Sequence, residues 1–201
     1  MLQPLLHLSS HELLNTFMID VRHPEAFAES HVKNALNIPL GAQFCNWVGM
    51  IVPKQMPLAL IVPNSQIADQ LAKSLWMIGY DKIAGYSLWE DLSKEAISLD
   101  ALPLLQVQDV AQGSYWILDV RTPAEWHSGH IHNAHQIELA KLSQALSEIP
   151  RDSSIATICG SGFRSSVAAS FLRKAGFASV INIQGGMQAW HQARLPLSKA
   201  S

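Results

Sequence analysis

One short segment, residues 159–164, concentrates the residue types that could perform chemistry. It reads Cys159-Gly-Ser-Gly-Phe-Arg164. A thiolate is a strong nucleophile, and a neighbouring arginine or helix amino end lowers the pKa of a thiol. The segment therefore indicates a nucleophilic cysteine next to a binding place for an anionic substrate or leaving group.

The sequence on either side predicts the elements that must position this segment. Residues 154–159 are mostly apolar, which is typical of a buried strand, and residues 164–175 place apolar residues at helical spacing before Gly176. A glycine-rich turn between a strand and a helix can point successive backbone N–H groups at an anion. With Cys159 as the catalytic residue, the residues expected to bind the substrate are Gly160, Ser161, Gly162, Phe163 and Arg164.

A second strand and helix are expected earlier in the same half of the chain. Residues 117–120 form an apolar run, and Thr122-Pro-Ala-Glu125 follows it directly. Thr122 is suited to cap a helix, with Pro123 at its first position and Glu125 closing a capping box. Alternating strands and helices favour an α/β fold, with a mainly parallel sheet flanked by helices.

The chain repeats itself at an offset of 99 residues, from residues 5–35 to residues 104–134. Identical residues at matching positions are Asp20 and Asp119, Arg22 and Arg121, Pro24 and Pro123, His31 and His130, and Asn34 and Asn133. Because polar and apolar positions keep one register, the sequence predicts two related domains. We place them at residues 1–99 and 100–201.

The first repeat lacks the nucleophile. Aligned through Gly79 and Gly176, Val62 stands where Cys159 stands, and Ile67 replaces Arg164. A shift by one residue would place Pro63 there, which also supplies no thiol. Cys45 lies well upstream of this loop and is interpreted as structural or incidental. Residues 1–99 are therefore predicted to be noncatalytic.

Two further groups of residues could be interpreted as functional, one as a catalytic acid with an anion-binding arginine and the other as a zinc site. The repeat favours a structural interpretation of both. Asp119 and Arg121 recur in the half without the cysteine, which favours a structural ion pair or loop anchor. A histidine-rich stretch could suggest zinc, but His130 has its counterpart His31 in a half without such a cluster. We therefore predict no metal site at His127, His130, His132 and His135.

Taken together, these motifs resemble the rhodanese family in its tandem-domain form. The resemblance rests on Asp119-Val-Arg121, on Glu125-Trp-His-Ser-Gly-His-Ile131, on the loop 159–164 and on Gly185-Gly186 with Trp190. It implies a sulfurtransferase without a cofactor, in which Cys159 accepts a sulfane sulfur as a persulfide. It also implies a small-molecule sulfur donor, a thiol or cyanide acceptor, and a sulfur-relay protein as a further partner.

The loop itself bears on the donor and on the alternatives. Four residues separate Cys159 from Arg164, whereas related phosphatases of this fold have one more, which favours sulfur over phosphate. Cys159-Gly-Ser-Gly162 looks like the opening of a mercaptopyruvate sulfurtransferase loop, but Phe163-Arg164-Ser165 looks like the loop of thiosulfate-using and persulfide-carrying rhodaneses. Thiosulfate is favoured, with 3-mercaptopyruvate, a persulfide-carrier or regulatory module, and a cysteine phosphatase as alternatives.

Composition excludes several other classes of protein. The 201 residues carry 14 Lys+Arg and 16 Asp+Glu, a net charge of −2, so no basic excess supports nucleic-acid binding. Two cysteines cannot make a disulfide framework, which favours a reducing compartment. The sequence shows neither a signal peptide nor an apolar run long enough to span a membrane, and we expect a cytoplasmic protein without membrane partners.

Overall fold

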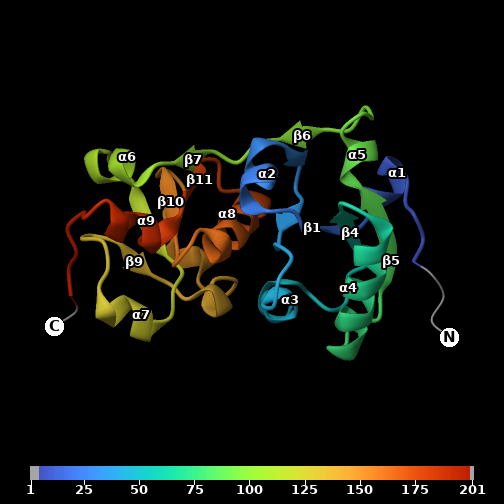
Figure 1. Cartoon of the computed structure of the whole chain (residues 1–201), viewed down its shortest axis with the longest axis horizontal. Helices are drawn as coiled ribbons and strands as arrows, with labels where there is room; N and C mark the ends of the chain where they lie inside the picture. Colours follow the sequence, from blue (N-terminus) through green and yellow to red (C-terminus); the bar gives the residue numbers. More distant parts are fainter. Residues whose placement is uncertain (1–4, 200–201) are drawn as a thin grey trace. The chain divides into compact units, whose positions relative to one another are not determined.

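The computed structural model describes residues 5–199 of the chain. The chain divides into two compact units, with the boundary between Ala101 and Leu102. Each unit has its own parallel sheet flanked by helices (Figure 1).

The N-terminal unit is built on a four-stranded sheet in the order β3-β1-β4-β5, with every pairing parallel. Its strands are β1 (Phe17–Asp20), β3 (Leu36–Asn37), β4 (Leu58–Val62) and β5 (Ile83–Leu88). Its helices are α1 (Ser10–Leu13), α2 (Pro24–Glu29), α3 (Phe44–Ile51), α4 (Ser65–Met77) and α5 (Trp89–Leu92). The short strands β2 (His31–Val32) and β6 (Leu99–Asp100) pair antiparallel beside it.

The C-terminal unit is built on a five-stranded sheet in the order β7-β11-β10-β8-β9, again parallel throughout. Its strands are β7 (Leu104–Leu105), β8 (Trp116–Asp119), β9 (His135–Gln136), β10 (Ile155–Ile158) and β11 (Val180–Ile183). Its α-helices are α6 (Val107–Gln112), α7 (Pro123–Ser128), α8 (Phe163–Lys174) and α9 (Gly186–Gln192), and the 3-10 helices are η1 (Leu139–Lys141) and η2 (Leu146–Glu148). The predicted α/β class is confirmed.

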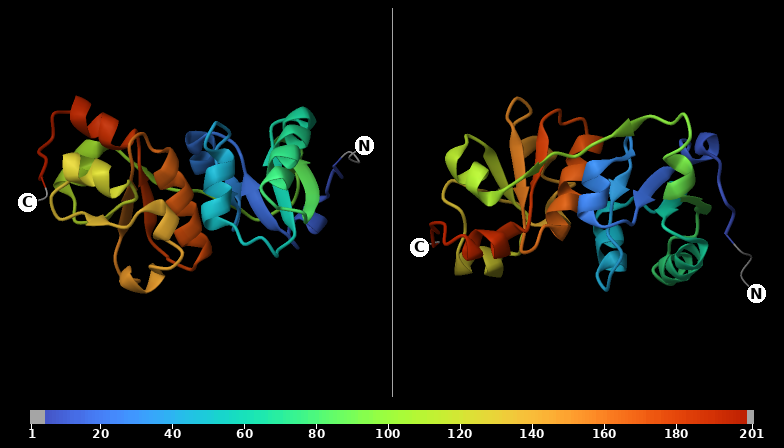
Figure 2. Two further views of the ribbon diagram at one scale, coloured as in Figure 1. Left: turned by 90° about the horizontal axis from the view of Figure 1, so that it is seen from below. Right: turned by 45° about the horizontal axis from the view of Figure 1, so that its top comes forward.

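Helices cover both faces of the C-terminal sheet. Helices α6 and α9 lie on one side and α8 on the other, as Figures 1 and 2 show. The apolar core on the first side joins α6 and α9 to the sheet through Val110, Ile158, Met187 and Trp190. Strands buried on both faces are expected to be apolar throughout, and the four residues of β10 are all buried.

The predicted helix signals are confirmed. Thr122 caps α7, Pro123 is its first residue, and Glu125 completes the capping box. Gly176 follows the end of α8 with a φ of 88°, a left-handed conformation that suits glycine, and its N–H donates to the carbonyl of Arg173. Predicted and observed strand and helix ends differ by about one residue, as is usual at frayed ends.

The Asp and Arg shared by the two repeats form the same buried ion pair in each unit. In the C-terminal unit the Arg121 guanidinium donates to both carboxylate oxygens of Asp119 and to the carbonyl of Gly129. In the N-terminal unit Arg22 does the same with Asp20 and Ser30. This pair ties the carboxyl end of the first long strand to the end of the following helix, which confirms a structural role.

Replacing the acid of this pair is expected to destabilise either unit. Asp119→Ala leaves the buried guanidinium of Arg121 without its counter-charge, and breaking a buried pair in this way costs about 3–5 kcal/mol. Urea denaturation should show a loss of this size, and Asp20→Ala is the matched change in the N-terminal unit. A loss below about 1 kcal/mol in both variants would contradict the structural assignment.

Candidate active site

Cys159 lies directly after β10, the central strand of the C-terminal sheet. The chain then turns through Gly160, Ser161 and Gly162 and enters α8 at Phe163. Gly162 adopts a left-handed conformation with a φ of 95°, which a residue without a Cβ accepts at little cost. The cysteine therefore sits at the carboxyl edge of the sheet and beside the amino end of a 12-residue helix.

Two donors, one in the loop and one in the first turn of α8, point at the sulfur. The backbone N–H of Gly162 lies 3.2 Å from Sγ of Cys159, and the Ser165 hydroxyl lies 3.4 Å from it. Cys159 is only 1% exposed, while Gly160 is half-buried and Ser161 is exposed. The sulfur thus lies at the bottom of a polar turn whose outer side faces solvent, and donors of this kind stabilise a thiolate.

The start of α9 holds the loop from its other side. The N–H groups of Met187 and Gln188 donate to the carbonyls of Cys159 and Gly160, at 2.8 Å and 2.9 Å. This close approach requires a glycine at position 186, because a Cβ there would collide with the carbonyl oxygen of Cys159. The Gly185-Gly186 motif therefore fixes the direction of the loop carbonyls.

Two buried polar side chains support the loop from beneath. The Thr157 hydroxyl donates to the carbonyl of Ser165, and the amide of Asn182 donates to the carbonyl of Gly162 at 3.3 Å. Both side chains are fully or almost fully buried. The Asn182 amide therefore holds the carbonyl of Gly162, the residue whose N–H points at the sulfur.

The guanidinium of Arg164 is held by Glu125 from α7. Nη1 and Nη2 of Arg164 donate to the two carboxylate oxygens of Glu125, at 2.8 Å and 2.6 Å. One of these oxygens also accepts from the backbone and hydroxyl of Thr122. Arg164 therefore stands beside the loop, as expected of a substrate-binding residue, but in a two-pronged ion pair.

This ion pair stays fully charged at neutral pH. Hydrogen bonds from Arg164 lower the pKa of Glu125 to about 2. The pKa of Arg164 is raised, chiefly by the hydrogen bonds to Glu125 and against the lowering effect of burial.

The histidine-rich stretch has other contacts. His130 stacks on Trp126 with ring centroids 3.7 Å apart, as His31 stacks on Phe27 in the other repeat. His127 is hydrogen-bonded to the carbonyl of Pro123. His132 contacts the hydroxyl of Ser198, and His135 stacks on Trp116. Among residues 5–199, no three or more His, Cys, Asp or Glu side chains are grouped to hold a metal ion.

The equivalent loop of the N-terminal unit differs in both length and capping. Ile61 pairs with Asp20 in the first sheet, as Ile158 pairs with the equivalent Asp119 in the second. Val62, the next residue, therefore has the position in its unit that Cys159 has in the other. Counted from these two equivalent residues, two residues (63–64) precede α4, whereas three (160–162) precede α8. The side chain of Asn64 caps α4, whereas no side chain in the described part of the chain caps α8. Cys45 lies on α3, and burial raises the pKa of its thiol.

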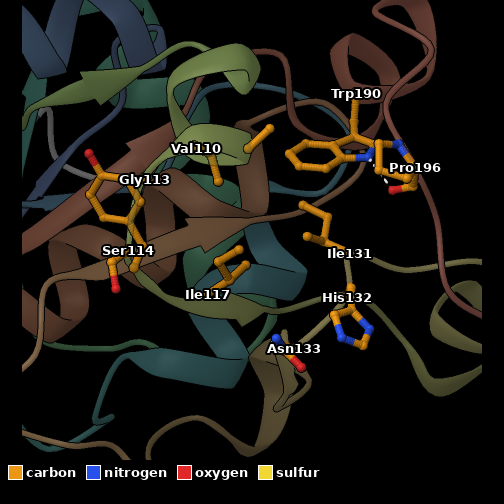
Figure 3. A pocket seen from close by; sticks show the side chains of 11 residues that line it. Val110, Gly113, Ser114, Ile117, Ile131, His132, Asn133, Trp190 and Pro196 are labelled. Atoms are coloured by element: carbon orange, nitrogen blue, oxygen red, sulfur yellow. Dashed lines mark hydrogen bonds between the residues drawn. The ribbon is translucent and has the colours of Figure 1, made fainter.

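A separate cavity of about 350 Å³ lies in the C-terminal unit between α6, β8 and α9. Figure 3 shows Val110, Ile117, Ile131 and the Trp190 ring around it, with Trp190 hydrogen-bonded to Pro196. Its lining includes none of the residues of the loop 159–164. The cavity is therefore not the place where the thiol would act.

Comparison with known proteins identifies the fold. The model of the rhodanese-like domain matches this chain twice, at residues 5–90 and 104–193. The chain belongs to the rhodanese-like domain family. It carries two such domains in tandem, and the second contains the cysteine loop. Along residues 5–199, none of the helices combines the length and hydropathy needed to cross a membrane.

Relatives of this chain include named sulfurtransferases. It is 38% identical over 81 residues to a sulfurtransferase of Allochromatium vinosum, covering 40% of this chain and 76% of the relative. It is 31% identical over 81 residues to the thiosulfate sulfurtransferase GlpE of Vibrio cholerae, with the same coverage. It is 35% identical over 82 residues to the probable adenylyltransferase/sulfurtransferase MoeZ of Mycobacterium tuberculosis. That match covers 40% of this chain but only 21% of the relative.

Two solved structures show partial similarity to this chain. A rhodanese-related protein of Thermoplasma volcanium is 30% identical, with a TM-score of 0.47, and the match covers 49% of this chain and 99% of that one. The thiosulfate sulfurtransferase of Pseudomonas aeruginosa is 21% identical, with a TM-score of 0.45, and covers 94% of this chain. This chain spans 42% of that protein.

Sequence reasoning missed three contacts at the site. It treated Glu125 only as a helix cap, quoted Ser165 without a role, and did not consider Asn182. A signal was present for Glu125, because the repeat alignment places Ala26 at its position. Ser165 follows the loop arginine directly in the first turn of the helix, where its hydroxyl could reach back to the cysteine.

The close approach of α9 predicts a strong effect of Gly186→Ala. The new Cβ would collide with the Cys159 carbonyl and lie 3.0 Å from the carbonyl of Gly160, at a φ of 56°. We expect a loss of roughly 1–3 kcal/mol in unfolding free energy and altered reactivity of Cys159 toward a thiol reagent. Gly49→Ala on α3, where a Cβ meets nothing within 4 Å, is the control. Equal stability of the two variants would contradict the proposed packing.

The Glu125 ion pair predicts a defined dependence of stability on pH. The pKa of Glu125 is lowered on folding from 4.5 to about 2, so its contribution is complete above about pH 5 and is lost as the pH falls toward 2. The difference in unfolding free energy between the native chain and Glu125→Gln should therefore shrink from pH 6 to pH 3. A difference that stays constant over this interval would refute the lowered pKa.

Proposed function

We propose that the second rhodanese domain is a sulfurtransferase in which Cys159 carries the transferred sulfur as a persulfide. The supporting observation is the placement of its sulfur, which receives the Gly162 N–H and the Ser165 hydroxyl at the junction of β10 and α8. Such donors favour the thiolate over the thiol and lower the cost of a negative charge on an attached sulfur. The first domain, with Val62 at the equivalent position, is proposed to be noncatalytic.

The proposed reaction has two displacement steps. After the thiol proton leaves to solvent, the Cys159 thiolate attacks the outer sulfur of the donor. With thiosulfate, the sulfur–sulfur bond breaks, sulfite departs with the electron pair, and Cys159 becomes a persulfide. A thiolate or cyanide then attacks the outer sulfur of the persulfide and releases the Cys159 thiolate, so no external oxidant or reductant is needed.

Thiosulfate is the donor that we propose first. Its negative charge suits a loop with amide donors, a helix amino end and Arg164, and one relative is named a thiosulfate sulfurtransferase. The partners are then a small sulfur donor and a thiol or cyanide acceptor. A free thiol as the working group is best kept in a reducing compartment, which supports a cytoplasmic location.

Cys159→Ser is expected to abolish thiocyanate formation from thiosulfate and cyanide, because the serine hydroxyl cannot form a persulfide. Steady-state rates with thiosulfate and with mercaptopyruvate should be measured on the native chain and on this variant. Cys45→Ser is the control and should retain full activity, since Cys45 lies on a helix of the other unit. Undiminished turnover by Cys159→Ser would refute the assignment.

The same protein allows the donor to be identified. Intact-mass analysis after incubation with thiosulfate should show one added sulfur on the native chain and none on Cys159→Ser. Loading by a cysteine desulfurase but not by thiosulfate would replace the enzyme proposal with a persulfide carrier. Faster turnover of mercaptopyruvate than of thiosulfate would make mercaptopyruvate the donor. Hydrolysis of an aryl phosphate would make the protein a phosphatase instead of a sulfurtransferase.

A further inference from the structure

The two repeats provide an internal comparison that separates scaffold residues from site residues. Asp119 and Arg121 recur as Asp20 and Arg22 and make the same contacts in both units. Glu125 does not recur, because the matching position is Ala26. A residue that accompanies only the cysteine-bearing loop is a candidate for a role at that loop.

Forming the helix does not require the carboxylate. Helix α2, with Ala26 at this position, and helix α7, with Glu125, each have six residues and a side-chain cap at the start, from His23 and Thr122 respectively. The fold therefore builds the same helix without an acid there. The contact that has no counterpart in the first repeat is the ion pair with Arg164.

The ion pair lies next to the open side of the loop. A Cβ added at Gly160 would be 3.4 Å from Nη2 of Arg164 and 3.9 Å from Oε1 of Glu125. The side chains of Arg164 and Glu125 are 26% and 37% exposed, and Ser161 is exposed as well. Both charged groups therefore lie beside Gly160, the loop residue next to Cys159.

We propose that Glu125 is a specificity-determining residue that offsets the charge of Arg164 and thereby weakens the binding of anionic sulfur donors. This inference rests on the proposed function and deepens it. With the pair in place, attraction of an anion to the guanidinium is opposed by repulsion from the carboxylate. The loop amides remain to bind the donor, so the site discriminates less strongly between dianionic and uncharged donors.

The decisive experiment measures binding without reaction. In the Cys159→Ser background, thiosulfate is titrated while the amide resonances of the loop are followed by NMR. Adding Glu125→Gln should tighten binding about tenfold, because glutamine can keep the cap at Thr122 through its amide oxygen, gives up one of the two hydrogen bonds to Arg164 and removes the negative charge. Sulfate should show a similar gain, and the gain should fall as salt is added.

Two further variants serve as controls. Asp152→Asn removes one negative charge from an exposed position before β10, whose opposite end carries Cys159, and should leave thiosulfate binding unchanged. Arg164→Ala removes the partner, and Glu125→Gln added to it should still tighten binding, although from a weaker starting affinity. Thermal unfolding of every variant checks that the fold is retained.

Binding of thiosulfate that is unchanged or weakened by Glu125→Gln would overturn the proposal, since it would mean that the carboxylate only positions Arg164. In the active chain, the same substitution should lower KM for thiosulfate and leave KM for an uncharged dialkyl trisulfide donor unchanged. The binding result is independent of turnover. Absence of thiosulfate turnover in the native chain would therefore refute the proposed function, while tighter binding in Glu125→Gln would still support the charge effect.

Discussion

The organisation of the C-terminal domain depends on how a buried sulfur atom is given polar partners. Cys159 is almost fully buried, and an ionised group in that position would be strongly disfavoured without donors. Gly162 and Ser165 supply them from the turn and from the first turn of α8. The left-handed backbone at Gly162 is needed for this, and the amide of Asn182 restrains it from beneath.

The same site joins two rigid parts of the domain. Helix α9 donates hydrogen bonds to the carbonyls of Cys159 and Gly160. Helix α7 binds the guanidinium of Arg164 through the carboxylate of Glu125. The carbonyls of Cys159 and Gly160 therefore have their partners on α9. The N–H of Gly162 has the Cys159 sulfur as its partner. A loop fixed in this way needs little rearrangement when a charge develops at the sulfur, which is the main requirement of electrostatic stabilisation.

The tandem repeat shows which features belong to the fold and which to the chemistry. The buried Asp–Arg pair and the stacked histidine are present in both units. The unit with Val62 in place of the loop cysteine has a shorter turn, and a side-chain oxygen of Asn64 occupies the amino end of α4. Both changes remove what an anion would use, although the sheet and helix on either side are retained. The scaffold is thus independent of the turn that carries Cys159.

The sequence by itself determined the local features: the strand–turn–helix around Cys159, the cap at Thr122, the stop at Gly176 and the repeat. These depend on neighbouring residues, so spacing and residue type suffice to predict them. Only the tertiary structure decided the partner of Arg164, because Glu125 lies 39 residues away and on another helix. Likewise, the contact of α9 with the loop joins strand ends that meet only when the parallel sheet forms. Long-range pairs of this kind follow from the order of strands in the sheet, which local patterns do not encode.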